Sequence, residues 1–113
     1  MRYLVAITLL SFLATPAFAE EDEFAATEAK IKAALVSDHR DEEETARDRN
    51  RKAVETLKFF GLRDDMTVLE LLPGGGWYTK ILGPVLEENG QLYISIGAER
   101  IGEALEGKPG FNS

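Results

Sequence analysis

A glycine-rich turn after an apolar, acid-containing segment is the part of this chain best suited to chemistry. Three consecutive glycines, Gly74 to Gly76, follow Pro73, and the apolar run before them contains one acid, Glu70. Glycines let the backbone turn sharply and let a ligand approach without meeting a Cβ atom, and a helix start presents unpaired N–H groups. The segment predicts a nucleotide-type binding site, although a turn that only connects two elements has the same composition.

Glu70 strengthens this prediction. Burying an acid in a strand of valine and leucine is costly unless something pairs with it, so its presence indicates a ligand or a specific hydrogen-bond donor. The alternative is an edge strand in which Glu70 faces water.

The spacing of the glycines decides which class of nucleotide fits. A dinucleotide fingerprint needs Gly-x-Gly-x-x-Gly, and Thr79 stands where the third glycine belongs. A phosphate-binding P-loop needs Gly-Lys-Ser/Thr, which the sequence lacks. The remaining pattern, an apolar segment with an acid followed by a glycine-rich turn, resembles motif I of the class I S-adenosylmethionine-dependent methyltransferases.

A wider resemblance covers residues 39–93. There the chain resembles a family of predicted exported bacterial methyltransferases, on the segments Arg47-Asp48, Arg51-Lys52, Leu57-Lys58-Phe59-Phe60-Gly61-Leu62, Met66-Thr67-Val68-Leu69-Glu70 and Pro73-Gly74-Gly75-Gly76-Trp77-Tyr78-Thr79. The resemblance implies a Rossmann-like methyltransferase fold, S-adenosylmethionine as cofactor, and a small-molecule or unidentified methyl acceptor. It implies a cofactor site made of Glu70, Pro73, Gly74, Gly75, Gly76, Trp77 and Tyr78, the two aromatics lining the pocket. It assigns no catalytic residue and no metal. Trp77 and Tyr78 are equally typical of aromatic residues that pack the start of a helix onto the core and of residues that line a pocket.

The chain departs from that family in three respects. Many class I methyltransferases have a glycine where Leu72 stands, and an acid at the end of the second strand, for which only Glu99 is available. Glu99 is more typical of a helix N-terminus, where the helix dipole favours an acid. Family members are also considerably longer, so we expect an incomplete chain that represents the N-terminal part of such a domain.

Two helices are predicted before the glycine turn. Helical spacing predicts one over residues 24–36, preceded by a solvated, disordered acidic stub at 20–23. A capping pair, Asp41 and Glu44, opens a second helix that runs to Phe60 and ends at Gly61. We expect the buried stripe of this helix to consist of Ala46, Ala53, Val54, Leu57 and Phe60. On its solvent-exposed face we expect two ion pairs of opposite charge, Glu43–Arg47 and Asp48–Lys52.

The glycine turn is expected to lie between a strand and a helix. Residues 67–72 predict a strand buried on both faces, and residues 78–86 a helix that Pro84 kinks or restarts. A second strand over 91–96 and a short helix over 99–105 follow. This order is the opening of a parallel α/β sheet with right-handed crossovers, and residues 111–113 resemble the approach to a third strand.

Two further sets of residues offer weaker possibilities. His39, the only histidine, is suited to act as a base, but a solvated histidine in a polar hinge is the commoner situation. The basic residues Arg47, Arg49, Arg51 and Lys52 suit an anionic substrate, although the interleaved acids favour a salt-bridged helix face.

Composition bounds the class of protein. Residues 2–19 predict an export signal, with one positive residue, an apolar run and cleavage after Ala19. We expect a periplasmic or secreted protein with no stable membrane span after cleavage, and an uncleaved N-terminal anchor is the lesser alternative. The chain has 113 residues and no cysteine, which excludes disulfides. Its net charge of −7 argues against nucleic acid as a partner.

We expect the chain to consist of a signal at 1–19, a stub and first helix at 20–38, and the methyltransferase-like part at 39–113.

A function of a different class stays open. The chain also fits a non-catalytic exported module that keeps the glycine turn as structure and binds a partner through its long amphipathic helix. This alternative is motivated by the two predicted strands, which by themselves have nowhere to enclose a cofactor.

Overall fold

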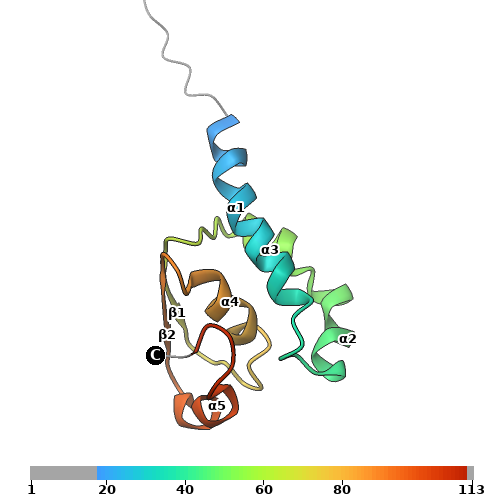
Figure 1. Cartoon of the computed structure of the whole chain (residues 1–113), viewed down its shortest axis with the longest axis vertical. Coiled ribbons are helices and arrows are strands. Elements are labelled where there is room, and N and C mark those ends of the chain that lie inside the picture. The colour runs from blue at the N-terminus through green and yellow to red at the C-terminus, as the bar shows by residue number, and fades with distance from the viewer. Residues whose placement is uncertain (1–17, 112–113) are drawn as a thin grey trace, which may run out of the picture.

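The computed structural model describes residues 18–111, in which helices and strands alternate from residue 67 onward (Figure 1). In chain order the elements are α1 (Phe18–Leu35), α2 (Glu42–Arg51), α3 (Ala53–Phe59), β1 (Thr67–Glu70), α4 (Thr79–Leu86), β2 (Gln91–Ile94) and α5 (Ala98–Leu105). This described part is a small mixed domain of five helices and a two-stranded parallel sheet, compatible with the expected α/β class.

The two strands pair in parallel and are joined through α4. Thr67 lies opposite Gln91, and Glu70 lies opposite Ile94, so both strands end at the same edge of the sheet. Because parallel strands need a crossover connection, the glycine turn and α4 together form that crossover.

The sheet has one covered face and one open face. Val68 and Leu92 pack against the core on the side of α4. On the opposite face Leu69 and Tyr93, neighbours in register, are more than half exposed. The expectation that the first strand is buried on both faces is therefore wrong for residues 18–111. The strand also ends at Glu70 rather than Leu72.

The core lies between α1, α3 and α4. Its fully buried side chains include Ile31 of α1 and Ile81, Val85 and Leu86 of α4, and Leu57 of α3 adds to them. Each such side chain contributes about 1.5–3 kcal/mol by leaving water. Since α4 lies between α1 and the sheet (Figure 1), it is buried along almost its whole length.

The first helix begins earlier than expected. It starts at Phe18, so the acidic residues 20–23, expected to be disordered, belong to its first turns. Glutamate is a good helix former and is stabilised near a helix N-terminus by the helix dipole, which explains the difference. Two contacts anchor this helix: Thr27 Oγ1 accepts the Asp64 N–H at 3.0 Å, and Lys30 Nζ lies 2.6 Å from Asp64 Oδ2.

The predicted second helix is two helices. Its capping box is confirmed, with the Glu44 N–H donating to Asp41 Oδ1 at 2.8 Å and the Asp41 N–H donating to Glu44 Oε2 at 2.9 Å. The helix does not run on to Phe60, because Lys52 adopts a left-handed conformation with φ +46° and separates α2 from α3.

The end of α3 is as predicted. Gly61 has φ +71°. Its N–H donates to the Lys58 carbonyl at 2.9 Å, and the Leu62 N–H donates to the Leu57 carbonyl at 3.0 Å. This is the Schellman pattern, in which a left-handed residue lets the chain satisfy the last carbonyls of a helix.

The predicted buried stripe is correct only within α3. Ala53 and Leu57 are buried and Val54 is half-buried, but Ala46 and Phe60 are exposed. The left-handed residue between the helices changes the direction of the chain, so one stripe cannot continue from α2 into α3. The Glu43–Arg47 ion pair is confirmed at 2.9 Å.

The C-terminal elements are close to their predicted ranges. β2 ends at Ile94 rather than Ile96, and α5 begins one residue before the predicted start. Pro84 lies inside α4 and does not start a new helix. Phe111, expected to approach a third strand, places its ring against Gly83 of α4, where an added Cβ would collide with it.

The predicted export signal lies almost entirely outside the described residues. None of the helices within 18–111 is both long enough and apolar enough to cross a membrane.

Candidate functional site

The predicted site residues gather at the edge of the sheet where β1 and β2 end. Glu70 is the last residue of β1, and the turn from Pro73 to Gly76 leads from it into α4. The Ile94 end of β2 lies beside Glu70 in register, and Gly97, with φ +88°, then opens α5. In open parallel sheets ligands bind outside the carboxyl ends of the strands, so the predicted residues occupy the expected position for a ligand.

The glycine turn uses all three of its glycines, but in different ways. The Gly76 N–H donates to the Pro73 carbonyl at 2.8 Å and closes the turn. Gly74 (φ +56°) and Gly76 (φ +86°) adopt left-handed conformations, and Cβ atoms added at Gly74 or Gly75 would meet nothing within 4 Å. A Cβ on Gly76 would meet Ile101 Cδ1 of α5 at 2.6 Å. Gly74 and Gly75 therefore border open space, whereas Gly76 is needed for packing.

Glu70 does not project into bulk water. Its side chain is on the half-buried face of β1, and Oε2 accepts a hydrogen bond from Thr79 Oγ1 at 2.6 Å. Burial raises the pKa of the Glu70 carboxyl, and the Thr79 hydroxyl opposes part of that rise by favouring the charged form. Oε1 accepts no hydrogen bond from the described residues. The specific donor that the sequence suggested is thus Thr79, the fully buried first residue of α4.

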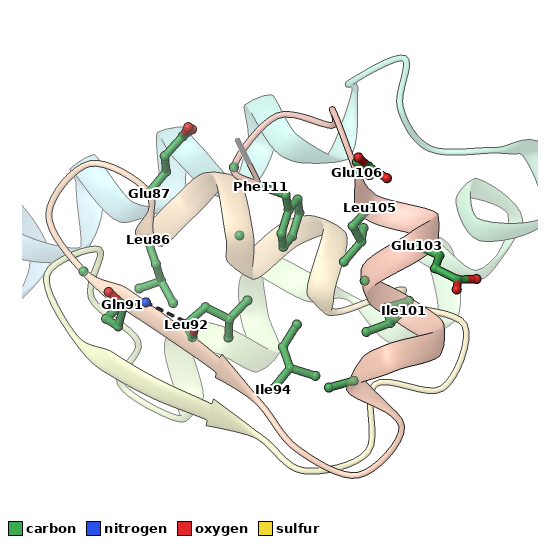
Figure 2. A pocket seen from close by; sticks show the side chains of 15 residues that line it. Leu86, Glu87, Gln91, Leu92, Ile94, Ile101, Glu103, Leu105, Glu106 and Phe111 are labelled. Atoms are coloured by element: carbon green, nitrogen blue, oxygen red, sulfur yellow. Dashed lines mark hydrogen bonds between the residues drawn. The ribbon is translucent and has the colours of Figure 1, made fainter. Parts of the chain in front are cut away.

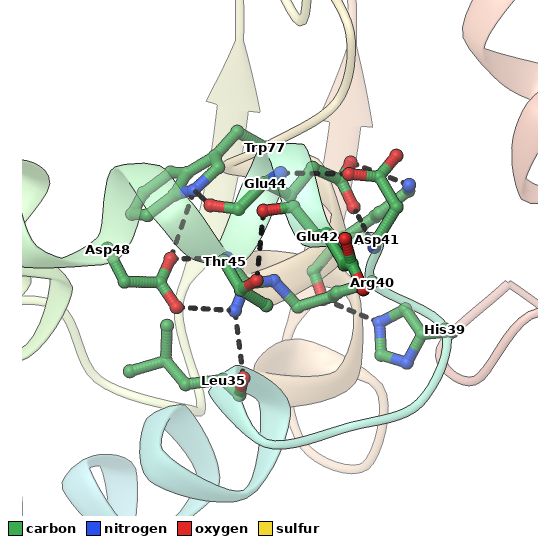
Figure 3. Close-up of polar contacts among 10 residues, drawn as sticks. Leu35, His39, Arg40, Asp41, Glu42, Glu44, Thr45, Asp48 and Trp77 are labelled. Carbon is green, nitrogen blue, oxygen red and sulfur yellow. Dashed lines mark hydrogen bonds and ion pairs between the residues drawn. The ribbon is translucent and has the colours of Figure 1, made fainter.

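Trp77 ties the turn to α2 (Figure 3). The indole is buried, and its Nε1–H lies 2.9 Å from the Glu44 carbonyl oxygen and 3.1 Å from Asp48 Oδ1. The guanidinium of Arg51 lies 4.7 Å from the centre of the ring, within cation–π range. The arrangement is that of the packing alternative, in which the aromatic residue fixes the start of the helix. Tyr78 is half-buried and contacts Trp77 edge to face at 4.7 Å.

A buried arginine completes this anchor. Arg40, whose side chain is fully buried, donates to both carboxylate oxygens of Asp48, at 2.9 and 2.6 Å, and to the Leu35 carbonyl at 2.8 Å. Asp48 therefore pairs with Arg40 and Trp77, and the predicted Asp48–Lys52 pair is wrong. A two-pronged guanidinium–carboxylate pair has a fixed geometry, so it holds the loop between α1 and α2 against α2, whose Asp48 also accepts from the Trp77 indole.

Lys80 joins α4 to α2 through its side chain and to the loop between α1 and α2 through its backbone carbonyl. Its Nζ lies 2.6 Å from Glu44 Oε1, and both side chains are nearly buried. Its carbonyl accepts from His39 Nε2 at 3.1 Å, while Ser37 Oγ pairs with Nδ1. His39 is half-buried, so the expectation of a solvated histidine is wrong.

His39 meets a need that Pro84 creates. Within an α-helix the carbonyl of Lys80 would accept from the N–H four residues later, but that residue is Pro84, which has none. His39 supplies the missing donor from another part of the chain. The sequence signal for this role was the proline inside an apolar helix, which predicts a carbonyl in need of a partner.

The remaining candidates do not converge on the glycine turn. Arg47 and Arg49 are exposed on α2, Arg51 stacks on Trp77, and Lys52 forms the left-handed junction. Glu99 is exposed in the first turn of α5, which fits the helix-terminus alternative. Within residues 18–111 no group of three or more His, Asp or Glu side chains is placed to hold a metal ion.

A separate hollow lies beside Ile101 of α5. It is a groove of about 760 Å³ between β2, α4 and α5, and none of the predicted cofactor residues lines it (Figure 2).

Comparison of the chain with protein-family models, with curated proteins and with solved structures found no match.

Proposed function

We propose that the chain is an S-adenosylmethionine-dependent methyltransferase with a Rossmann-like fold, acting on an unidentified acceptor. The proposal rests on the resemblance of its glycine turn and flanking segments to that family. The parallel β1–α4–β2 arrangement supports it, because it puts the turn at the carboxyl ends of the strands.

One observation carries the proposal: two bare glycines border open space beside a half-buried carboxylate. Gly74 and Gly75 have no atom within 4 Å of an added Cβ, and Glu70 keeps Oε1 free of hydrogen bonds to the described residues. The methionine part of the cofactor carries an ammonium, a carboxylate and a sulfonium. A carboxylate and exposed backbone N–H groups are complementary to these charges, so the residues present fit this part of the cofactor.

The chemistry asked of these residues is mostly positioning. When bound, S-adenosylmethionine supplies an electrophilic methyl group. Glu70 favours a cationic ligand, the glycine turn lets that ligand reach the backbone, and Trp77 keeps the turn fixed against α2. Holding the acceptor in line with the methyl group lowers the barrier without a general base, and no residue is assigned to proton transfer.

Calorimetric titration of the full chain with S-adenosylmethionine tests the proposal. We expect micromolar binding, and at least about tenfold weaker binding for Glu70→Gln, since the charge is lost while an acceptor for Thr79 remains. Glu99→Gln is the matched control, because it removes an exposed acid outside the turn, and its affinity should equal that of the wild type. Absence of binding, or equal binding by both variants, would refute the assignment.

A further inference from the structure

The hydrogen bond between Thr79 and Glu70 joins the start of α4 to the end of β1, across the glycine turn. Thr79 is the first residue of α4 and has no exposed surface. Its Oγ1 lies 2.6 Å from Glu70 Oε2. A hydroxyl that donates to an ionised carboxylate typically lies about 2.5–2.7 Å from it. The carboxylate is therefore held from the helix side, by a residue nine positions further along the chain.

The hydroxyl of Thr79 commits its single proton to this bond. A threonine in a helix commonly donates to a carbonyl three or four residues earlier, which here belongs to Gly76 or Gly75. Thr79 donates instead to Glu70. The Gly76 carbonyl accepts the Lys80 N–H at 2.9 Å. Since Thr79 is fully buried, neither water nor another segment of the chain can compete for its hydroxyl proton.

Charged groups of the neighbouring elements do not replace this donor. Lys80 of α4 pairs with a glutamate of α2 at 2.6 Å, and β2 contains no charged residue. Glu99 and Arg100, in the first turn of α5, are exposed, and neither pairs with Glu70. Burial raises the pKa of Glu70, and among residues 18–111 the Thr79 hydroxyl alone opposes that rise. One neutral donor thus supports both the orientation and the charge of this carboxylate.

We infer that Thr79 is a positioning residue of the proposed cofactor site: its hydroxyl holds Glu70 by Oε2 and favours the ionised carboxylate, so that Oε1 serves the ammonium of the methionine part of S-adenosylmethionine. This inference rests on the proposed function. It deepens that function by naming the residue through which Glu70 is oriented for its ligand.

Calorimetric titration of the full chain with S-adenosylmethionine, between about pH 5 and about pH 9, tests the inference. Valine matches threonine in shape but lacks the hydroxyl, so Thr79→Val should bind at least about fivefold more weakly than the wild type at neutral pH. Because the pKa of Glu70 rises when the donor is lost, the fall in affinity on acidification should also begin at a higher pH in this variant. Thr79→Ser keeps the hydroxyl and should bind within about twofold of the wild type over the whole range.

A second set of variants shows whether Thr79 acts through Glu70. In the Glu70→Gln background the charge is already lost, so Thr79→Val should change the affinity by less than about twofold. Thr27→Val is the matched control, because Thr27 is equally buried but lies on α1, where its hydroxyl oxygen accepts the Asp64 N–H at 3.0 Å. Valine at position 27 also removes a buried hydrogen bond, and the affinity and pH profile of this variant should equal those of the wild type.

A measurement on the wild type needs no variant that must fold. The hydroxyl proton of Thr79 should be protected from exchange with water in NMR spectra, and it should remain protected when S-adenosylmethionine is bound. Free exchange of this proton in the complex would show that the bond to Glu70 is not kept there.

Five results would each overturn the inference and leave the proposed function in place, provided that the wild type binds the cofactor and Glu70→Gln weakens that binding. These are a wild-type affinity and pH profile in Thr79→Val, an equal loss of affinity in Thr27→Val, an equal loss in Thr79→Ser, a full additional loss from Thr79→Val in the Glu70→Gln background, and free exchange of the hydroxyl proton in the complex. Absence of cofactor binding by the wild type would instead refute the proposed function, and the inference with it.

Discussion

The carbonyl of Lys80 provides a test of how the loop between α1 and α2 is held on α4. Pro84 has no N–H to offer it, and His39 Nε2, at 3.1 Å, takes that place. His39→Phe keeps an aromatic ring in the same space and removes the donor. Since Lys80 is only 8% exposed, its carbonyl would then be left without a partner away from water.

The expected magnitude follows from that geometry. A buried polar group left without a partner costs about 1–3 kcal/mol, so His39→Phe should lower the free energy of unfolding by about 2 kcal/mol. Pro84→Ala restores a backbone N–H that can donate to the Lys80 carbonyl from within α4. In that background, removing the donor of His39 should cost less than about 1 kcal/mol, which gives a coupling energy of about 1–2 kcal/mol.

Urea unfolding of the four proteins, followed by far-ultraviolet circular dichroism, completes the double-mutant cycle. Asp38→Asn is the control, because this exposed neighbour makes no hydrogen bond to α4, and its stability should change by less than about 0.5 kcal/mol. If His39→Phe costs the same in both backgrounds, the histidine does not replace the proline's missing donor, and the reasoning fails.

Two further predictions concern the glycine turn and its acid. Gly76→Ala should destabilise the chain by about 2–4 kcal/mol, because it combines an unfavourable φ with a collision with Ile101, whereas Gly75→Ala should stay within about 0.5 kcal/mol of the wild type in the same urea experiment. Equal changes in stability for Gly76→Ala and Gly75→Ala would show that Ile101 of α5 does not pack on the turn. In the wild type the Thr79 hydroxyl favours the charged form of Glu70. Thr79→Val removes that hydroxyl and should raise the pKa of Glu70 further, as measured by NMR titration of its carboxyl carbon. Because the pKa of Glu70 is higher in the folded state than in the unfolded state, protonated Glu70 contributes to folding stability at low pH. That contribution is lost as the pH rises through the folded-state pKa. Thr79→Val should therefore lose more folding stability than the wild type over that pH range. An unchanged pKa would contradict the hydrogen bond.

Local sequence signals predicted much of the fold. Asp41 with Glu44 gave the start of α2, and Gly61 gave the end of α3, because both depend on hydrogen bonds between residues close in the chain. The order of strand, glycine turn, helix and strand was also predicted correctly, since periodicity and turn composition are local properties.

The features that the sequence did not reveal depend on contacts between distant residues. Nothing near Lys52 indicates a left-handed residue between two helices with good helix formers on both sides. The pairing of Asp48 with Arg40 and Trp77 replaced the local pair with Lys52, because a buried guanidinium and an indole need that carboxylate more than an exposed lysine does. Thr79 was seen only as a departure from a glycine motif, and its bond to Glu70 joins the end of a strand to a helix start nine residues later.

The anchors of α2 also set an order of events during synthesis. Glu44 finds its partner in Lys80, 36 residues further on, and the Glu44 carbonyl finds the indole of Trp77, 33 residues further on. A helix of ten residues is barely stable by itself in water. The ribosome must therefore have made residue 80 before α2 can form these two long-range contacts, so the helix depends until then on its capping box and on the Arg40–Asp48 pair.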